Sequence, residues 1–172
     1  VVVRARGPSL TAAGVPGALG NPVLQLFSGA TQIDANDNWQ QAANQATLLS
    51  SGFAPSDPLE SALYTTLNPG AYTAIVTGAN LTTGVAIIEV FEVGTPEVPL
   101  LNIATRGKVL TGADVMIGGF IIQGDGPQTV IVRARGPSLT AAGVPGALQD
   151  PVLQLFSGQT VIASNDDWQT SP

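Results

Sequence analysis

The sequence predicts an all-β protein made of antiparallel β-sandwich or jelly-roll-like modules, and three observations lead to this class. Only 10% of the residues are charged, while the chain holds 20 glycines and 13 prolines. Its apolar segments are short, rich in Val, Ile and Thr, and separated by Gly and Pro turn signals, as in sandwiches and jelly rolls. A long stretch also occurs twice, which predicts a tandemly repeated folding unit.

The duplication pairs residues 1–40 with residues 130–169 at a constant offset of 129 residues. The string RARGPSLTAAGVPGAL is identical in both copies. The period exceeds the roughly 20 to 50 residues of a solenoid repeat and suits an independent domain. We therefore expect residues 1–98 to be the C-terminal part of one module and residues 99–172 to be the N-terminal part of the next.

The elements of the first copy follow in order. A strand over 1–6 ends at Gly7-Pro8, and 9–22 reads as an ordered loop with one helical turn. Strands over 23–27 and 31–35 flank Ser28-Gly29, which predicts a hairpin.

A helix is expected next, because apolar residues from Trp39 to Leu49 recur at spacings of three and four. Asn36 and Asp37 are candidates for its N-cap, and Gly52 is placed to end it in a left-handed turn.

Strands over 61–67 and 71–77 flank Asn68-Pro69-Gly70, which predicts a second hairpin with Tyr64 and Tyr72 as a cross-strand pair. A strand over 85–93 and a linker over 94–99 follow. Further strands are expected over 100–106, 115–123 and 129–135, so that one module has about eight strands and one short helix.

Neither part of the chain holds a whole module, so each is expected to expose sheet edges and apolar surface. Two sources of the absent strands stay open: a neighbouring copy that adds a strand to an open edge, or the same polypeptide, giving beads on a string. The best strand donors are 100–105 and 115–122. Their candidate assembly residues are Leu100, Ile103, Val115, Ile117 and Ile121.

The wording of the sequence resembles a module of large secreted proteins of environmental bacteria. The strings that carry the resemblance cover most of the chain: NIATRGKVLTGADVMIGGFIIQGDGPQTVIVRARGPSL, DPVLQLFSG, ASNDDW, LESALYTTLNPGAYTAIVTG and TGVAIIEVFEV. The resemblance implies tandem β-sandwich modules without assigned enzymatic activity, located outside the cell or on its surface. Nearly identical repeats also favour a subunit of an extracellular filament, with copies of itself as partners. The alternative is a carbohydrate-binding or adhesive module.

Polar clusters before the two tryptophans have two interpretations. Oxygen-rich loops can bind Ca²⁺, which takes about six to eight oxygen ligands. The same short side chains also form Asx turns and helix N-caps, which is the interpretation we favour. The residues are Asp34, Asn36, Asp37, Asn165, Asp166 and Asp167. No other cofactor or metal is predicted.

The arginine pairs Arg4 with Arg6 and Arg133 with Arg135 each lie on one face of a strand. They could clamp an anion, but structural braces to a carboxylate such as Glu60, Glu89 or Glu92, or to loop carbonyls, fit a chain with so few cations.

Trp39 and Trp168 are candidates for a polysaccharide platform, although a Trp with Ala and Leu at helical spacing is more typical of a core. Asn80 begins a glycosylation sequon, Asn80-Leu81-Thr82.

Composition excludes several function classes. The chain has no Cys or His and a net charge of −6. It therefore lacks the residues of conventional triads and zinc sites, and the basic surface that nucleic acid requires. No apolar run approaches the roughly 20 residues of a membrane span. We expect neither an enzyme, nor a nucleic-acid partner, nor a membrane span.

Overall fold

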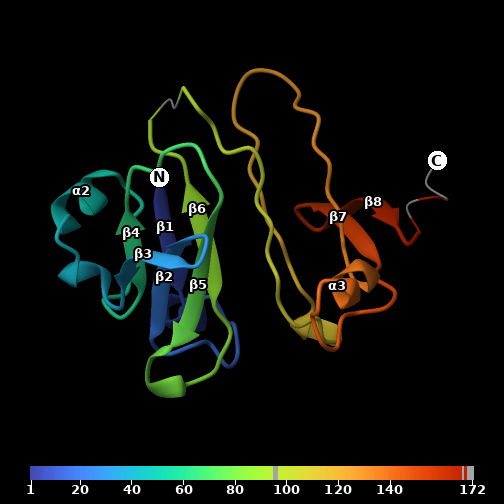
Figure 1. Ribbon diagram of the computed structural model, residues 1–172, viewed down its shortest axis with the longest axis horizontal. Helices are drawn as coiled ribbons and strands as arrows, with labels where there is room; N and C mark the ends of the chain where they lie inside the picture. The colour runs from blue at the N-terminus through green and yellow to red at the C-terminus, as the bar shows by residue number, and fades with distance from the viewer. Residues whose placement is uncertain (95–96, 168, 170–172) are drawn as a thin grey trace. The chain divides into compact units, whose positions relative to one another are not determined.

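The computed structural model describes residues 1–94, 97–167 and 169. The chain divides into two compact units, Val1–Ile103 and Ala104–Pro172. Across the described residues, eight strands form three antiparallel sheets, and all helices are short (Figure 1). The predicted all-β class is confirmed.

The first sheet has the order β4-β1-β6. Its central strand β1 (Val2–Arg6) pairs antiparallel with β4 (Ser61–Tyr64) and with β6 (Ile87–Phe91). Neighbouring side chains of a strand point to opposite faces. Val3 and Ala5 therefore join one buried cluster, while Val2 joins a second cluster on the other face.

The second sheet has the order β3-β2-β5 and also lies in the first unit. It consists of β2 (Pro22–Ser28), β3 (Thr31–Asn36) and β5 (Tyr72–Gly78). Leu24 and Leu26 of β2 meet Val3, Ala5 and Leu63 of the first sheet in one buried cluster. Burial of these side chains is the main force that holds the two sheets together.

One side of this unit is more open than the other. Figure 1 shows α2 (Gln45–Ser50) beside β4, and β5 and β6 on the opposite side. The apolar side chains that β5 and β6 add to the cluster are only half-buried. Among the described residues, β5 and β6 each pair on one edge alone.

The predicted strand over 1–6, the hairpin of β2 and β3, and the strand near 85–93 are confirmed. The helical turn after Gly7 is α1 (Pro8–Ala12).

The single helix predicted from Trp39 to Leu49 is wrong. The structure has a 3₁₀ turn, η1 (Trp39–Gln41), then an extended residue, Ala42, and then α2. Trp39 is fixed in the core, and the Asn44 side chain donates to the Tyr64 carbonyl at 2.7 Å. These tertiary contacts override the helical spacing. Gly52, with φ +78°, ends α2 as expected.

The hairpin predicted around Asn68-Pro69-Gly70 is also wrong. β4 pairs with β1 and β5 pairs with β2, so the turn crosses from one sheet to the other. Tyr64 and Tyr72 consequently contact different clusters and are not a cross-strand pair. The Tyr72 hydroxyl donates to the Asn68 carbonyl at 2.9 Å.

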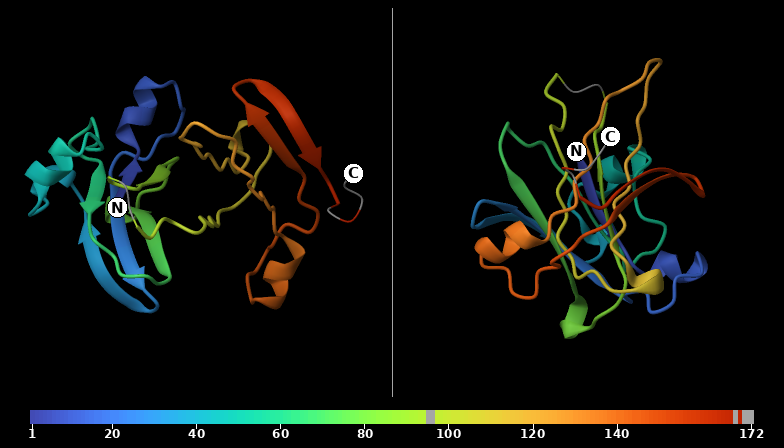
Figure 2. Two further views of the ribbon diagram at one scale, coloured as in Figure 1. Left: turned by 90° about the horizontal axis from the view of Figure 1, so that it is seen from above. Right: turned by 90° about the vertical axis from the view of Figure 1, so that its right-hand side faces the viewer.

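The second unit has a helical turn, α3 (Pro137–Ala141), and one hairpin of β7 (Leu153–Ser157) and β8 (Thr160–Asn165). Figure 2 shows 104–135 as an extended trace interrupted only by η3 (Gly112–Asp114). The strands predicted over 100–106, 115–123 and 129–135 are therefore absent from the described residues. A strand needs a neighbour for its N–H and C=O groups, and these segments have no pairing partner there.

Candidate assembly site

Arg4 links β1 to three other parts of the first unit. Its Nε donates to Glu89 Oε2 at 2.6 Å, and its Nη1 donates to the Phe53 carbonyl at 2.8 Å. Its guanidinium also lies 4.8 Å from the centre of the Phe91 ring, which stacks on Phe53. Charge-assisted hydrogen bonds of this kind are stronger than neutral ones. Arg4 thereby fastens β6 and the 53–54 loop onto β1.

Arg6 points the same way but binds more locally. Its Nε donates to Ser9 Oγ at 3.0 Å, and its Nη1 is 4.0 Å from Glu89 Oε1. The carboxylate partner of both arginines is thus Glu89. Glu92 instead accepts a hydrogen bond from the Leu100 amide at 2.5 Å.

Glu60 is fully buried and binds the turn that leads into α1. Its Oε1 accepts hydrogen bonds from the Gly7 amide at 3.0 Å and from the Ser9 amide at 2.9 Å, as well as from Ser9 Oγ at 2.5 Å. Those amides are among the free N–H groups at the start of a helix. Glu60 was one of several possible partners for arginine on the sequence, and this role as a backbone clamp was missed, because the 53-residue separation gives no local signal.

A third contact joins the 82–86 loop to the 17–19 loop. The Leu19 amide donates to the Val85 carbonyl and the Val85 amide to the Gly17 carbonyl, both at 2.8 Å. A Cβ on Gly84 would lie 2.7 Å from the Leu19 backbone, so only glycine allows this approach. The sequence gave no sign of this contact, because it rests on backbone groups.

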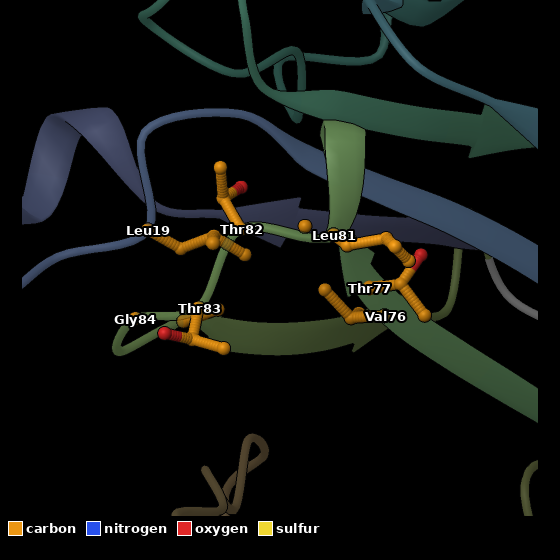
Figure 3. A pocket seen from close by; sticks show the side chains of 9 residues that line it. Leu19, Val76, Thr77, Leu81, Thr82, Thr83 and Gly84 are labelled. Atoms are coloured by element: carbon orange, nitrogen blue, oxygen red, sulfur yellow. The ribbon is translucent and has the colours of Figure 1, made fainter.

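Beside this contact lies a shallow, open pocket of about 510 Å³. Figure 3 shows Leu81 next to Val76 and Thr77 of β5, with Leu19 nearer Thr82. Leu81 is 96% exposed at φ +61°, and it holds no titratable neighbour in the pocket. The lining therefore offers apolar and hydroxyl contacts rather than reactive groups.

The second repeat reproduces the local structure of the first. α3 corresponds to α1, and the β7–β8 hairpin corresponds to β2–β3, including a register shift at Leu155/Phe156 that matches the one at Leu26/Phe27. Arg135 Nε donates to Ser138 Oγ at 3.1 Å, as Arg6 does to Ser9. The two copies therefore share every short-range feature of the fold.

Burial differs sharply between the copies. Val2 is fully buried, whereas its counterpart Ile131 is 87% exposed. Val3 is 3% exposed and Val132 is 40% exposed. Arg133 and Arg135 are exposed as well. The second repeat thus presents to solvent a face whose counterpart in the first repeat is core.

The candidate assembly residues before this repeat are also exposed. This group shares apolar chemistry and a lack of strand structure, and its members are Leu100, Ile103, Val115, Ile117 and Ile121. Exposed apolar surface of this extent is typical of interfaces.

The Ca²⁺ candidates are engaged with backbone groups where their contacts are known. Asp34 Oδ1 accepts from the Ala35 amide at 2.8 Å, and Asn36 Oδ1 accepts from the Ala62 amide at 3.0 Å. Asn36 Nδ2 donates to the Asn38 carbonyl at 3.1 Å, and Asn165 Nδ2 likewise to the Asp167 carbonyl at 3.2 Å. Asn36 therefore ties β3 to β4 instead of capping a helix, since Asn38 occupies the N-cap position of η1. Asp37 and Asp166 are exposed.

The polysaccharide candidates do not form a platform in the first unit. Trp39 is 7% exposed, and its Nε1 donates to the Asp57 carbonyl at 3.1 Å. Its indole contributes to the cluster with Val2 and Leu48, so its ring face is unavailable for stacking. Trp168 lies outside the described residues. Asn80 is exposed at φ +54° in η2 (Ala79–Leu81).

Among residues 1–94, 97–167 and 169, no group of three or more Asp, Glu, His or Cys side chains is placed to hold a metal ion. Over the same residues, no helix has the length and apolar character needed to cross a bilayer. No known protein family, curated protein or solved structure matches the chain.

Proposed function

We propose that this protein is a structural subunit of a bacterial extracellular filament or surface stalk. Its modules are β-sandwiches repeated in tandem, and copies join head to tail by packing or by strand complementation. The resemblance of the sequence to secreted bacterial modules supports the location outside the cell.

The single observation that carries the proposal is the exposed second repeat. Residues 130–169 have nearly the same sequence as 1–40, yet the side chains that form the core of the first unit are open to solvent in the second. A surface that is core in one copy gains free energy when another chain segment covers it. Covering it with a neighbouring copy gives a contact that does not close on itself, which generates an open array.

The first unit offers a complementary surface. β5 and β6 leave edges unpaired among the described residues, with half-buried apolar side chains between the sheets. The donor segments 100–105 and 115–122 are apolar, exposed and outside any sheet. Strand addition there would satisfy backbone groups and cover apolar surface together.

Electron microscopy and light scattering of the purified chain test the proposal. We expect regular fibres from the unaltered chain and their loss in the double variant Ile117→Asp with Ile121→Asp, which places two charges on one face of a donor segment. The matched control is Leu49→Asp, because Leu49 is an exposed apolar residue of α2, outside the proposed contacts. A chain that stays a compact monomer at all concentrations would contradict the proposed function.

A further inference from the structure

We propose that the second repeat, residues 130–169, is a docking site for residues 57–93 of a second copy of this chain. The inference rests on the proposed function, since it names two surfaces that join in the assembly. The template is the first unit, where residues 57–93 cover residues 1–40 in a defined register.

The differences between the repeats spare the docking face. The copies differ at eight positions, and only one of them, Val2, is buried in the first unit. There the second copy has Ile131, which is also apolar and β-branched. The other seven are exposed or half-buried positions of the first copy: Gly20, Asn21, Ala30, Gln32, Asp34, Ala35 and Asn38.

Three polar contacts of the template have their acceptor side intact in the second repeat. Arg133 corresponds to Arg4 and would pair with Glu89 of the incoming copy. The amides of Gly136 and Ser138 correspond to those bound by Glu60.

The backbone of Gly146 and Leu148 corresponds to Gly17 and Leu19, which bind Val85. Within this chain, only residues 57–93 carry two glutamates and a Gly-Val pair at the spacing that reaches all three places. The spacing selects this segment over the other apolar segments, and that is why we assign a second copy as the occupant.

Docking requires the incoming segment to leave its own first repeat. The exchange uncovers one repeat face for each face it covers, so the contacts of the two repeats nearly balance. Residues 99–129 precede only the second repeat, and their exposed apolar side chains then lie in the same module as the incoming β5 and β6. We infer that burial of this segment drives the exchange.

Engineered disulfides test the register, since the chain has no cysteine of its own. Gln25 lies opposite Ile75 in the β2–β5 ladder, so Gln154 should lie opposite Ile75 of the partner copy. Chains carrying Gln154→Cys and chains carrying Ile75→Cys are unfolded in urea, mixed in equal amounts and refolded under oxidising conditions. We expect a cross-linked heterodimer, with the bond located by peptide mass spectrometry.

Two controls flank this experiment. A single chain with Gln25→Cys and Ile75→Cys should form the intramolecular bond of the template. A mixture of Gln154→Cys with Gln32→Cys, which places the second cysteine on β3, should give at least ten-fold less heterodimer. Equal yields from both mixtures would overturn the docking site.

The ion pair gives an independent arm. Adding Arg133→Glu to the Gln154→Cys chain should lower the heterodimer yield about ten-fold, because two carboxylates would then face each other. Glu89→Arg in the partner chain should restore the yield. Lys108→Glu, the same charge change outside the docking face, should leave it unchanged; equal losses from Arg133→Glu and Lys108→Glu would count against the proposed register.

Fibre formation is scored separately by electron microscopy. A specific cross-link between dimers that never form fibres supports the docking site and removes the proposed function. Fibres in which positions 154 and 75 do not cross-link remove the docking site and leave the proposed function in place.

Discussion

Residues 1–40 and 130–169 are one sequence in two environments. Both form a helical turn after a Gly-Pro pair and a hairpin with a register shift at the same place, and Gly29 and Gly158 turn the two hairpins at φ +58° and +59°. In the first copy, however, the strand over Val2–Arg6 is the centre of a sheet, whereas the corresponding residues 131–135 form no strand.

The difference separates local from long-range causes. Turns and the hairpin need only groups within about twenty residues of one another, so both copies form them. The central strand needs β4 and β6, which lie more than fifty residues further along the chain. The first repeat has those neighbours and the second does not, so the matched substitutions below should affect the two copies unequally wherever burial matters.

The largest difference is expected for Leu24→Ala against Leu153→Ala. Leu24 is fully buried, and its truncation should lower the free energy of unfolding by about 3 kcal/mol, because it leaves a cavity between the two sheets. Leu153 is half-buried in a hairpin, and the same change should cost less than about 1 kcal/mol. Urea unfolding followed by circular dichroism measures both. Equal costs would mean that the second repeat already has a core of its own.

Glu60→Ala should cost about 2 to 3 kcal/mol, since it leaves the Gly7 and Ser9 amides without their acceptor inside the protein. Asp125→Ala, at an exposed turn, serves as the control and should change stability by less than about 0.5 kcal/mol. The same urea titration gives both values. Hydrogen exchange of the two amides should also accelerate in Glu60→Ala; unchanged exchange would contradict the clamp.

Gly84→Ala should destabilise the first unit by about 1 to 3 kcal/mol, because the added Cβ meets the Leu19 backbone and the two loops must separate. Gly118→Ala is the matched control, since a Cβ there has no atom within 4 Å. Thermal unfolding of both variants checks the contrast. A stable Gly84→Ala chain would show that the 17–19 and 82–86 loops do not need to touch.

The smallest expected effect is one that the two repeats share. Gly29→Ala and Gly158→Ala each force a Cβ into a left-handed conformation and should each cost about 1 kcal/mol of hairpin stability. Hydrogen exchange of the hairpin amides measures each copy separately. Unequal effects would show that the surroundings of the hairpin, and not its own geometry, decide the turn.

Much of the first unit could be predicted from the sequence. Turn residues located β1, the β2–β3 hairpin and the end of α2, since each depends on neighbours close in the chain. The two wrong elements have tertiary causes: the connection after β4 leads to the other sheet, and burial of Trp39 interrupts the expected helix. Of the site, Arg4 and Glu89 were candidates for a brace, whereas the hydrogen bonds of Glu60 join residues too far apart for any spacing rule.

The amino-acid sequence by itself determined the repeat, the all-β class and the short-range elements, because composition, turn chemistry and side-chain alternation act over a few residues. The tertiary structure alone decided which of two nearly identical segments becomes core. Val2 and Ile131 have similar side chains, and they differ in burial because β4 and β6 cover only the first. Burial depends on contacts between distant segments, and that information does not reside in either repeat.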